Sequence, residues 1–169
     1  MQEFVEGRLT FSFPKPLSAQ QYDGWSFYRN QFTSAFGGAK AVDFICLDKD
    51  CAWLIEVKDY RLDRRTKPGE LGEEVANKVR DTLAGLVAAS CNANDEDERR
   101  FAAKVLKKNT LRVVLHIEQP EKHSKLFPRI VNPASLVMKL KQLLKAVDAH
   151  PLVVDQHSLT PAMRWNVEG

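Results

Sequence analysis

Two short apolar runs on either side of a polar loop constrain the fold of this chain more than any other feature. Residues 41–47 (AVDFICL) and 52–58 (AWLIEVK) are rich in β-branched and aromatic side chains, and they flank the loop 48–51. Runs of this length and composition favour strands over helices. Because each run is almost continuously apolar, both faces of the strands should be covered. The sequence therefore predicts a buried β-hairpin.

Three ionisable residues interrupt this apolar hairpin: Asp43 in the first run, and Glu56 and Lys58 in the second. If Leu47 pairs with Ala52, Asp43 lies directly opposite Glu56, with Cβ atoms roughly 4.5–5.5 Å apart on one face. Lys58 follows Glu56 by two residues and projects from the same face. Two carboxylates this close repel each other unless one takes up a proton or a cation lies between them.

This arrangement has two interpretations. Two carboxylates beside main-chain carbonyl groups suit a hard cation such as Mg²⁺ or Mn²⁺. Such an ion would lower the pKa of a bound water and neutralise the charge on a phosphate under attack, and a nearby lysine would orient that water. The alternative is a cross-strand salt bridge in which Lys58 neutralises Glu56 or Asp43. The spacing alone favours neither.

With these residues the chain resembles the PD-(D/E)xK, restriction-endonuclease-like nuclease superfamily. The resemblance rests on Asp43 and on the E-x-K motif formed by Glu56, Val57 and Lys58, and it extends over roughly residues 18–117. It implies a single α/β domain over residues 1–169, with a mixed central sheet flanked by helices. It also implies that Asp43, Glu56 and the main-chain carbonyl of Val57 hold Mg²⁺ or Mn²⁺, while Lys58 assists the attacking water.

The same resemblance suggests further site residues. Many members take another acid from the first helix, for which Asp23 is the candidate here. Basic residues just after the hairpin or on the next helix would contact the nucleic-acid backbone: Arg61, Arg64, Arg65, Lys78 and Arg80. A glutamate is missing from the first helix and a proline from the position before Asp43, where Val42 stands.

Local patterns predict the elements around the hairpin. Partial alternation over residues 4–13 predicts a strand. Ser18 with Gln21 forms a capping box, and aromatic residues at helical spacing up to Phe36 predict a helix with this stripe in the core. We expect further helices at about 70–90, 95–108 and from Asn132 onward, and strands at 111–117 and 152–154. The predicted order is β-α-β-β-α-α-β-α-β.

Positive charge is concentrated in one part of the sequence. Residues 99–141 hold 11 basic and two acidic residues, an excess of +9, so the rest of the chain has a net charge of −6. This asymmetry suits a polyanion, because each neutralised phosphate releases counterions. Solvation of helix faces by lysine is the alternative explanation.

These observations lead to a functional hypothesis. The chain has no apolar run of membrane-spanning length, no signal-peptide pattern and an odd number of cysteines, so we expect a cytoplasmic protein without a membrane partner. We expect a metal-dependent nuclease that hydrolyses phosphodiester bonds in DNA, as a possible homodimer or with a protein partner that supplies specificity. One alternative is a non-catalytic nucleic-acid-binding or assembly module on the same fold. Another is a domain whose basic surface binds an acidic protein.

Overall fold

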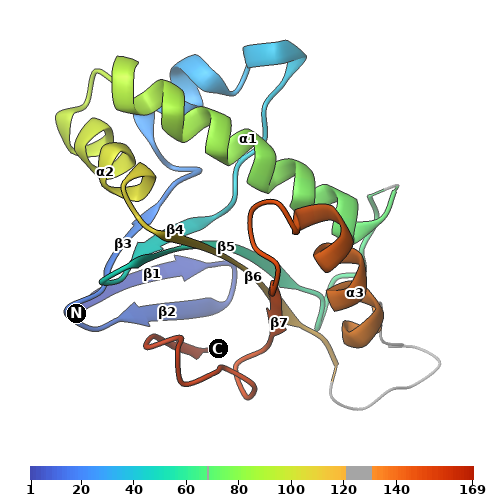
Figure 1. Ribbon diagram of the computed structural model, residues 1–169. Helices are drawn as coiled ribbons and strands as arrows, with labels where there is room; N and C mark the ends of the chain where they lie inside the picture. Colours follow the sequence, from blue (N-terminus) through green and yellow to red (C-terminus); the bar gives the residue numbers. More distant parts are fainter. Residues whose placement is uncertain (68, 121–130) are drawn as a thin grey trace.

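A five-stranded mixed sheet forms the centre of the computed structural model, which describes residues 1–67, 69–120 and 131–169 (Figure 1). Its order is β3-β4-β5-β6-β7, where β3, β4 and β5 are antiparallel neighbours and β5, β6 and β7 run parallel. The strands are β3 (Ser18–Gln21), β4 (Phe44–Leu47), β5 (Cys51–Asp59), β6 (Thr110–Glu118) and β7 (Leu152–Val154).

Different layers cover the two faces of this sheet. Helices α1 (Leu71–Asn92), α2 (Glu96–Leu106) and α3 (Pro133–Leu144) lie on one face. The other face packs against a second antiparallel sheet of β1 (Gln2–Glu6), β2 (Leu9–Phe13) and β8 (Asn166–Glu168) (Figure 1). The predicted α/β class, with a mixed sheet flanked by helices, is confirmed. The second sheet was not predicted.

The central hairpin has the predicted register. Leu47 pairs with Ala52, and Phe44 pairs with Ile55. Alternate side chains therefore enter two separate cores: Ile45 packs under the helices, while Phe44 and Ile55 pack against the second sheet. This two-sided burial explains why both strands are almost continuously apolar.

The N-terminal segment differs from the prediction. Residues 4–13 do not form one strand, because the chain turns at Gly7, with φ of 61°, and returns as β2. Residues 18–21 form β3 instead of starting a helix, because they gain a full ladder of hydrogen bonds with β4. The side-chain amide of Gln2 occupies the outer edge of β3, where it donates to and accepts from the backbone of Ala19.

Short helical turns replace the rest of the predicted first helix. A π-helical turn covers Tyr28–Phe32, and a 3₁₀ turn covers Ala35–Gly37. Tyr22, Trp25 and Phe32 are buried as predicted, but Phe36 is exposed. The aromatic spacing predicted burial correctly for Tyr22, Trp25 and Phe32 but not for Phe36. It predicted the secondary structure incorrectly, since helical spacing alone does not show that the backbone between the aromatics is helical.

The remaining helices agree with the predictions, and each begins at a residue with a suitable cap or charge. The Asp95 side chain accepts N–H bonds from Asp97 and Glu98 at the start of α2, and Asn132 does the same for α3. Among the described residues, no helix combines the length and apolarity that crossing a membrane requires. The basic residues Lys122, Lys125 and Arg129 lie outside the described residues.

Candidate functional site

A cluster of carboxylates lies where the central hairpin meets the N-terminal segment. Glu6, Asp23 and Asp43 each place a carboxylate oxygen within 4.8 Å of the others. Asp43 is buried in the loop just before β4, where its backbone N–H donates to the carbonyl of Ile55. Its Oδ2 accepts the N–H of Val57 at 2.6 Å. Backbone bonds on both sides thus hold the Asp43 carboxylate in the cluster.

Glu56 lies next to this cluster and makes two close ion pairs. Its Oε1 is 2.8 Å from Nζ of Lys58 and 2.6 Å from Nζ of Lys78 on α1. Its Oε2 is buried and has no hydrogen-bond partner within the described residues. Lys58 also contacts Glu74 at 3.1 Å, and Glu74 is 2.6 Å from Arg65. Alternating charges therefore run from the hairpin along the first half of α1.

Burial shifts the acids of the cluster toward their protonated forms. Desolvation raises the pKa of Asp43 to about 8, and the nearby charge of Glu56 adds to this shift. Desolvation also raises the pKa of Glu6 and of Asp23. Burial opposes ionisation of Glu74 as well, but its bonds to Arg65 and Lys58 lower its pKa to about 2. Burial thus favours the neutral form of Asp43 near neutral pH, whereas its cationic partners keep Glu74 ionised.

The structure brings together all four residues that the sequence suggested for a reactive centre. Asp43, Glu56, Lys58 and Asp23 lie in one network, although Asp23 comes from a turn after β3 and not from a helix. The salt-bridge interpretation is confirmed for Lys58, which pairs with Glu56. Asp43 instead groups with two other acids, Glu6 and Asp23. Sequence reasoning missed Glu6, since nothing local marks an acid on a terminal strand.

The predicted backbone-binding residues divide into two groups. Lys78 and Arg65 point into the network and pair with Glu56 and Glu74. Arg61 pairs with Asp59 at 2.7 Å, so these three cations offset acids of the same chain. Arg64 and Arg80 are exposed, and Arg80 contacts the neighbouring Asp81. For Arg61, Arg65 and Lys78 the ion pairs argue against a role in binding phosphates.

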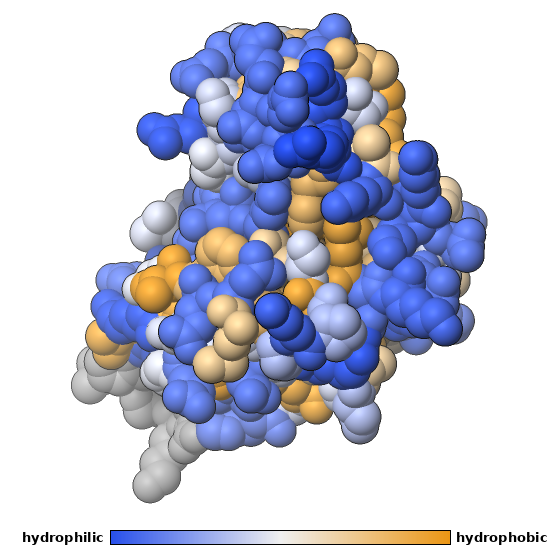
Figure 2. Space-filling model, turned by 90° about the vertical axis from the view of Figure 1, so that its left-hand side faces the viewer, coloured by the Kyte–Doolittle hydropathy of each residue, from blue (hydrophilic) through white to orange (hydrophobic). Residues whose placement is uncertain are grey.

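A basic hollow lies on another side of the molecule. It measures about 690 Å³ and lies between the β4–β5 loop and the C-terminal end of α2. Its charged lining residues are four basic ones, Lys49, Lys104, Lys108 and Arg164, and two acids, Asp48 and Asp50. An adjoining hollow of about 230 Å³ adds Lys107. We call the two adjoining hollows, with these five basic residues, the basic hollow. The side of the molecule that carries α2 is mostly hydrophilic, with apolar residues at the surface between two hydrophilic areas (Figure 2).

Two of the five basic residues in the basic hollow already contact other groups of the chain. Nζ of Lys108 donates to the carbonyls of Asp48 and Lys49 at 2.6 and 2.8 Å, and Arg164 pairs with Asp48. Lys49, Lys104 and Lys107 are exposed, and none forms an ion pair within the described part of the chain. These three ammonium groups are available to an anionic partner.

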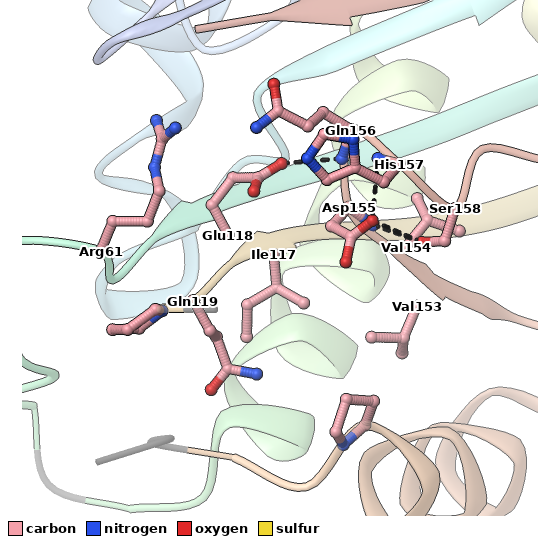
Figure 3. Close-up of a pocket in the computed structure, with 12 residues that line it drawn as sticks. Arg61, Ile117, Glu118, Gln119, Val153, Val154, Asp155, Gln156, His157 and Ser158 are labelled. Carbon is pink, nitrogen blue, oxygen red and sulfur yellow. Dashed lines mark hydrogen bonds between the residues drawn. The ribbon is translucent and has the colours of Figure 1, made fainter. Parts of the chain in front are cut away.

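A third hollow, of about 490 Å³, lies at the carboxyl ends of the parallel strands (Figure 3). Ligands often bind at this edge of α/β sheets. Here, however, buried Glu118 accepts the N–H of Gln156 at 2.8 Å and lies 2.8 Å from the His116 ring. Asp155 accepts the hydroxyl of Ser158 in the same way. These acids are satisfied within the chain, so the hollow defines no ligand chemistry.

Comparison with known proteins points away from nucleases. The chain is 33% identical over 207 aligned residues to a cysteine–tRNA ligase of Neisseria meningitidis serogroup A. The alignment covers 99% of this chain but only 30% of the ligase, so the chain spans about a third of the length of that relative. No protein-family model matches the chain. No solved structure matches it either.

The prediction of a metal-dependent nuclease is contradicted by this comparison. Similarity over almost the whole chain connects it with a ligase, whereas the nuclease prediction depended on a handful of residues around one hairpin. The charged residues do converge, but a set of converging acids and lysines does not by itself define a reaction. We therefore correct the predicted activity, and with it the classification as a hydrolase.

Proposed function

We propose that the chain is a non-catalytic RNA-binding domain that holds tRNA, on a fold of the restriction-endonuclease type. The observation that carries the proposal is the basic hollow, with three exposed lysines that form no ion pair within the described residues. The similarity to a cysteine–tRNA ligase over 99% of the chain indicates which polyanion to expect. The mixed sheet with its buried E-x-K hairpin supports the fold type.

The chemistry of the basic hollow suits a phosphate backbone. Lysine ammonium groups act as point charges that tolerate many phosphate positions, so they bind without reading base sequence. Each phosphate that they neutralise releases condensed counterions, and this release drives binding. Lys49 on the β4–β5 loop and Lys104 and Lys107 at the end of α2 approach the hollow from two sides. A backbone lying in the hollow would meet all three.

A binding measurement tests this proposal. Changing both Lys104 and Lys107 to Ala should weaken binding to tRNA and lower the slope of log affinity against log salt by about 0.7–0.9 for each lysine. Fluorescence anisotropy with labelled tRNA at several salt concentrations measures both quantities. The matched control changes Lys141 and Lys145, which are exposed on and just after α3, to Ala.

Two outcomes would overturn the proposal. One is equal loss of affinity in both double variants, because the basic hollow would then have no special role. The other is shortening of the tRNA on a denaturing gel after incubation with the parent protein and Mg²⁺, because the domain would then be a catalyst of RNA cleavage.

We also propose that the carboxylate cluster holds a divalent cation such as Mg²⁺ or Mn²⁺. Glu6, Asp23 and Asp43 supply the carboxylate oxygens that these ions prefer. Opposite ligands of Mg²⁺ lie about 4.2 Å apart, so small side-chain movements would bring the three oxygens into its reach. The buried Oε2 of Glu56 has no hydrogen-bond partner within the described residues, so it offers a further ligand oxygen beside the cluster. A bound cation would neutralise these acids.

This cation proposal predicts a change in thermal stability. Mg²⁺ or Mn²⁺ at millimolar concentration should raise the melting temperature, because a ligand that binds only the folded state stabilises it. Asp23→Asn should abolish the increase, whereas Asp63→Asn, at an exposed acid, should leave it unchanged. Differential scanning fluorimetry in EDTA and in Mg²⁺ measures the effect. An increase of equal size in Asp23→Asn would show that the ion binds elsewhere.

A further inference from the structure

Phe36 is an exposed aromatic residue in an unfavourable backbone conformation. Its side chain is 88% exposed, more than any other large apolar side chain that the structure describes. Its φ of 56° and ψ of 28° place it in the left-handed region, where no other non-glycine residue of the described chain lies. Bulky side chains rarely adopt this conformation, and a glycine there would be free of strain and would expose no apolar ring.

The surrounding structure holds this ring at the surface. Phe36 makes a T-shaped contact with the ring of Phe32, with centroids 6.0 Å apart and planes at 75°. Phe32 is buried against α1, where its Cε1 lies only 3.1 Å from the position of a Cβ on Gly85. Gly37 and Gly38, both with positive φ, lead the chain away. Phe36 therefore remains exposed on a segment whose neighbouring aromatic ring is anchored against α1.

The charge around Phe36 suits a nucleic acid. Residues 24–42 contain two basic residues, Arg29 and Lys40, and no acid. Both basic residues are exposed. Two acids from the helices contact this segment: Asp81 accepts the N–H of Lys40, and Glu98 accepts the N–H groups of Ser26 and Phe27. An exposed aromatic ring accompanied by exposed cations is the combination that proteins use to bind single-stranded nucleic acids, in which bases stack on the ring and phosphates approach the cations.

We propose that Phe36 stacks on an unpaired base of the bound RNA. This inference rests on the proposed RNA-binding function and adds a second contact point, separate from the basic hollow. Because every base has a π face, the contact selects unpaired nucleotides without selecting their sequence. The spacing of Phe36 with the other aromatic residues predicted that its ring would lie in the core. The left-handed backbone conformation keeps the ring at the surface instead.

Substitutions that separate stacking from apolar contact test the proposal. Phe36→Leu should weaken binding to a 16-nucleotide single-stranded RNA by about 5- to 140-fold, the range for loss of one stacked base. Phe36→Tyr keeps the ring and should bind like the parent. Binding to a blunt RNA duplex should not change in either variant. Met138→Ala, at a side chain 66% exposed on α3, serves as the control and should leave all affinities unchanged.

A spectroscopic measurement reports on stacking directly. Trp25, Trp53 and Trp165 are at most 5% exposed, so an indole in Phe36→Trp would be the most accessible one in the described chain. Addition of single-stranded RNA should quench its fluorescence and protect it from iodide. Melting curves of each variant show that it folds, and Phe36→Gly should melt at or above the temperature of the parent because the strain is relieved.

The outcomes separate this inference from the proposed function. If the parent binds neither tRNA nor single-stranded RNA, the proposed function is wrong and this inference falls with it. If the parent binds both and Phe36→Leu binds them equally well, only the stacking proposal is wrong. A protein partner covering Phe36 would give that second result.

Discussion

In a metal-free buffer, raising the pH from 5 to 8 is expected to destabilise the folded protein by up to about 4 kcal/mol. The pKa of Asp43 is about 8 in the folded state, against an ordinary value of 3.8. Between these values the folded protein binds one proton more than the unfolded chain. Its stability therefore falls by about 1.4 kcal/mol per pH unit as the pH rises. The contribution is fully present below pH 4 and is lost above pH 8.

Asp43→Asn should remove most of this dependence. The amide has the shape of the protonated acid, carries no charge, and its oxygen can still accept the N–H of Val57. Urea denaturation at pH 5, 6.5 and 8 in EDTA measures the effect, with Asp63→Asn as a control that should keep the slope of the parent. A parent protein with the same stability at pH 5 and pH 8 would contradict the raised pKa. Glu74 does not disturb the test, because its pKa of about 2 lies below this range.

Gly85→Ala should destabilise the protein by several kcal/mol, although alanine favours a helix by about 1 kcal/mol over glycine. Gly85 is buried in α1, and a Cβ there would lie 2.0 Å from Oη of Tyr22 and 3.1 Å from Cε1 of Phe32. Tyr22 is fully buried among other aromatic rings, so it has little room to move. Overpacking of this kind typically costs about 1–3 kcal/mol and sometimes more.

A second substitution should rescue most of this loss. Tyr22→Phe removes the clashing oxygen, which has no hydrogen-bond partner within the described residues. The other atoms of Tyr22 lie at least 3.2 Å from the position of the added Cβ. We therefore expect Tyr22→Phe alone to change stability little, and Gly85→Ala to cost much less in that background. Thermal melts of the four proteins form a double-mutant cycle, and additive effects would contradict the proposed clash.

The carboxylate cluster shows why the predicted activity was wrong although the predicted positions of Asp43 and Glu56 were correct. The register argument placed Asp43 and Glu56 near each other, and their charges do interact. The step from those residues to hydrolysis depended on a motif of three positions and on a family analogy. A buried network of acids and lysines equally suits binding of a cation, and chemistry cannot be inferred from residue types alone.

The elements that the sequence by itself determined are those with strong local signals. The two apolar runs define β4 and β5 together with their register, because a slip of one residue would move every side chain to the opposite face. The caps at Asp95 and Asn132 and the apolar periodicities define α2, α3 and α1. Each of these signals lies within one segment, so no distant contact is needed to interpret it.

Only the tertiary structure decided the remaining features, because they depend on contacts between distant segments. Residues 18–21 carry a helix-start pattern, yet they pair with β4, which supplies more hydrogen bonds than a helix cap would. Glu6 joins Asp23 and Asp43 because β1 lies beside β3, where the amide of Gln21 donates to the Glu6 carboxylate. Lys78 meets Glu56 because α1 packs across β5. Phe36 leaves the aromatic stripe because the π-helical turn ends at Phe32 and Phe36 itself has left-handed backbone angles. Local patterns thus specified the central hairpin and the helices, while packing between segments assembled the charged network and the exposed ring.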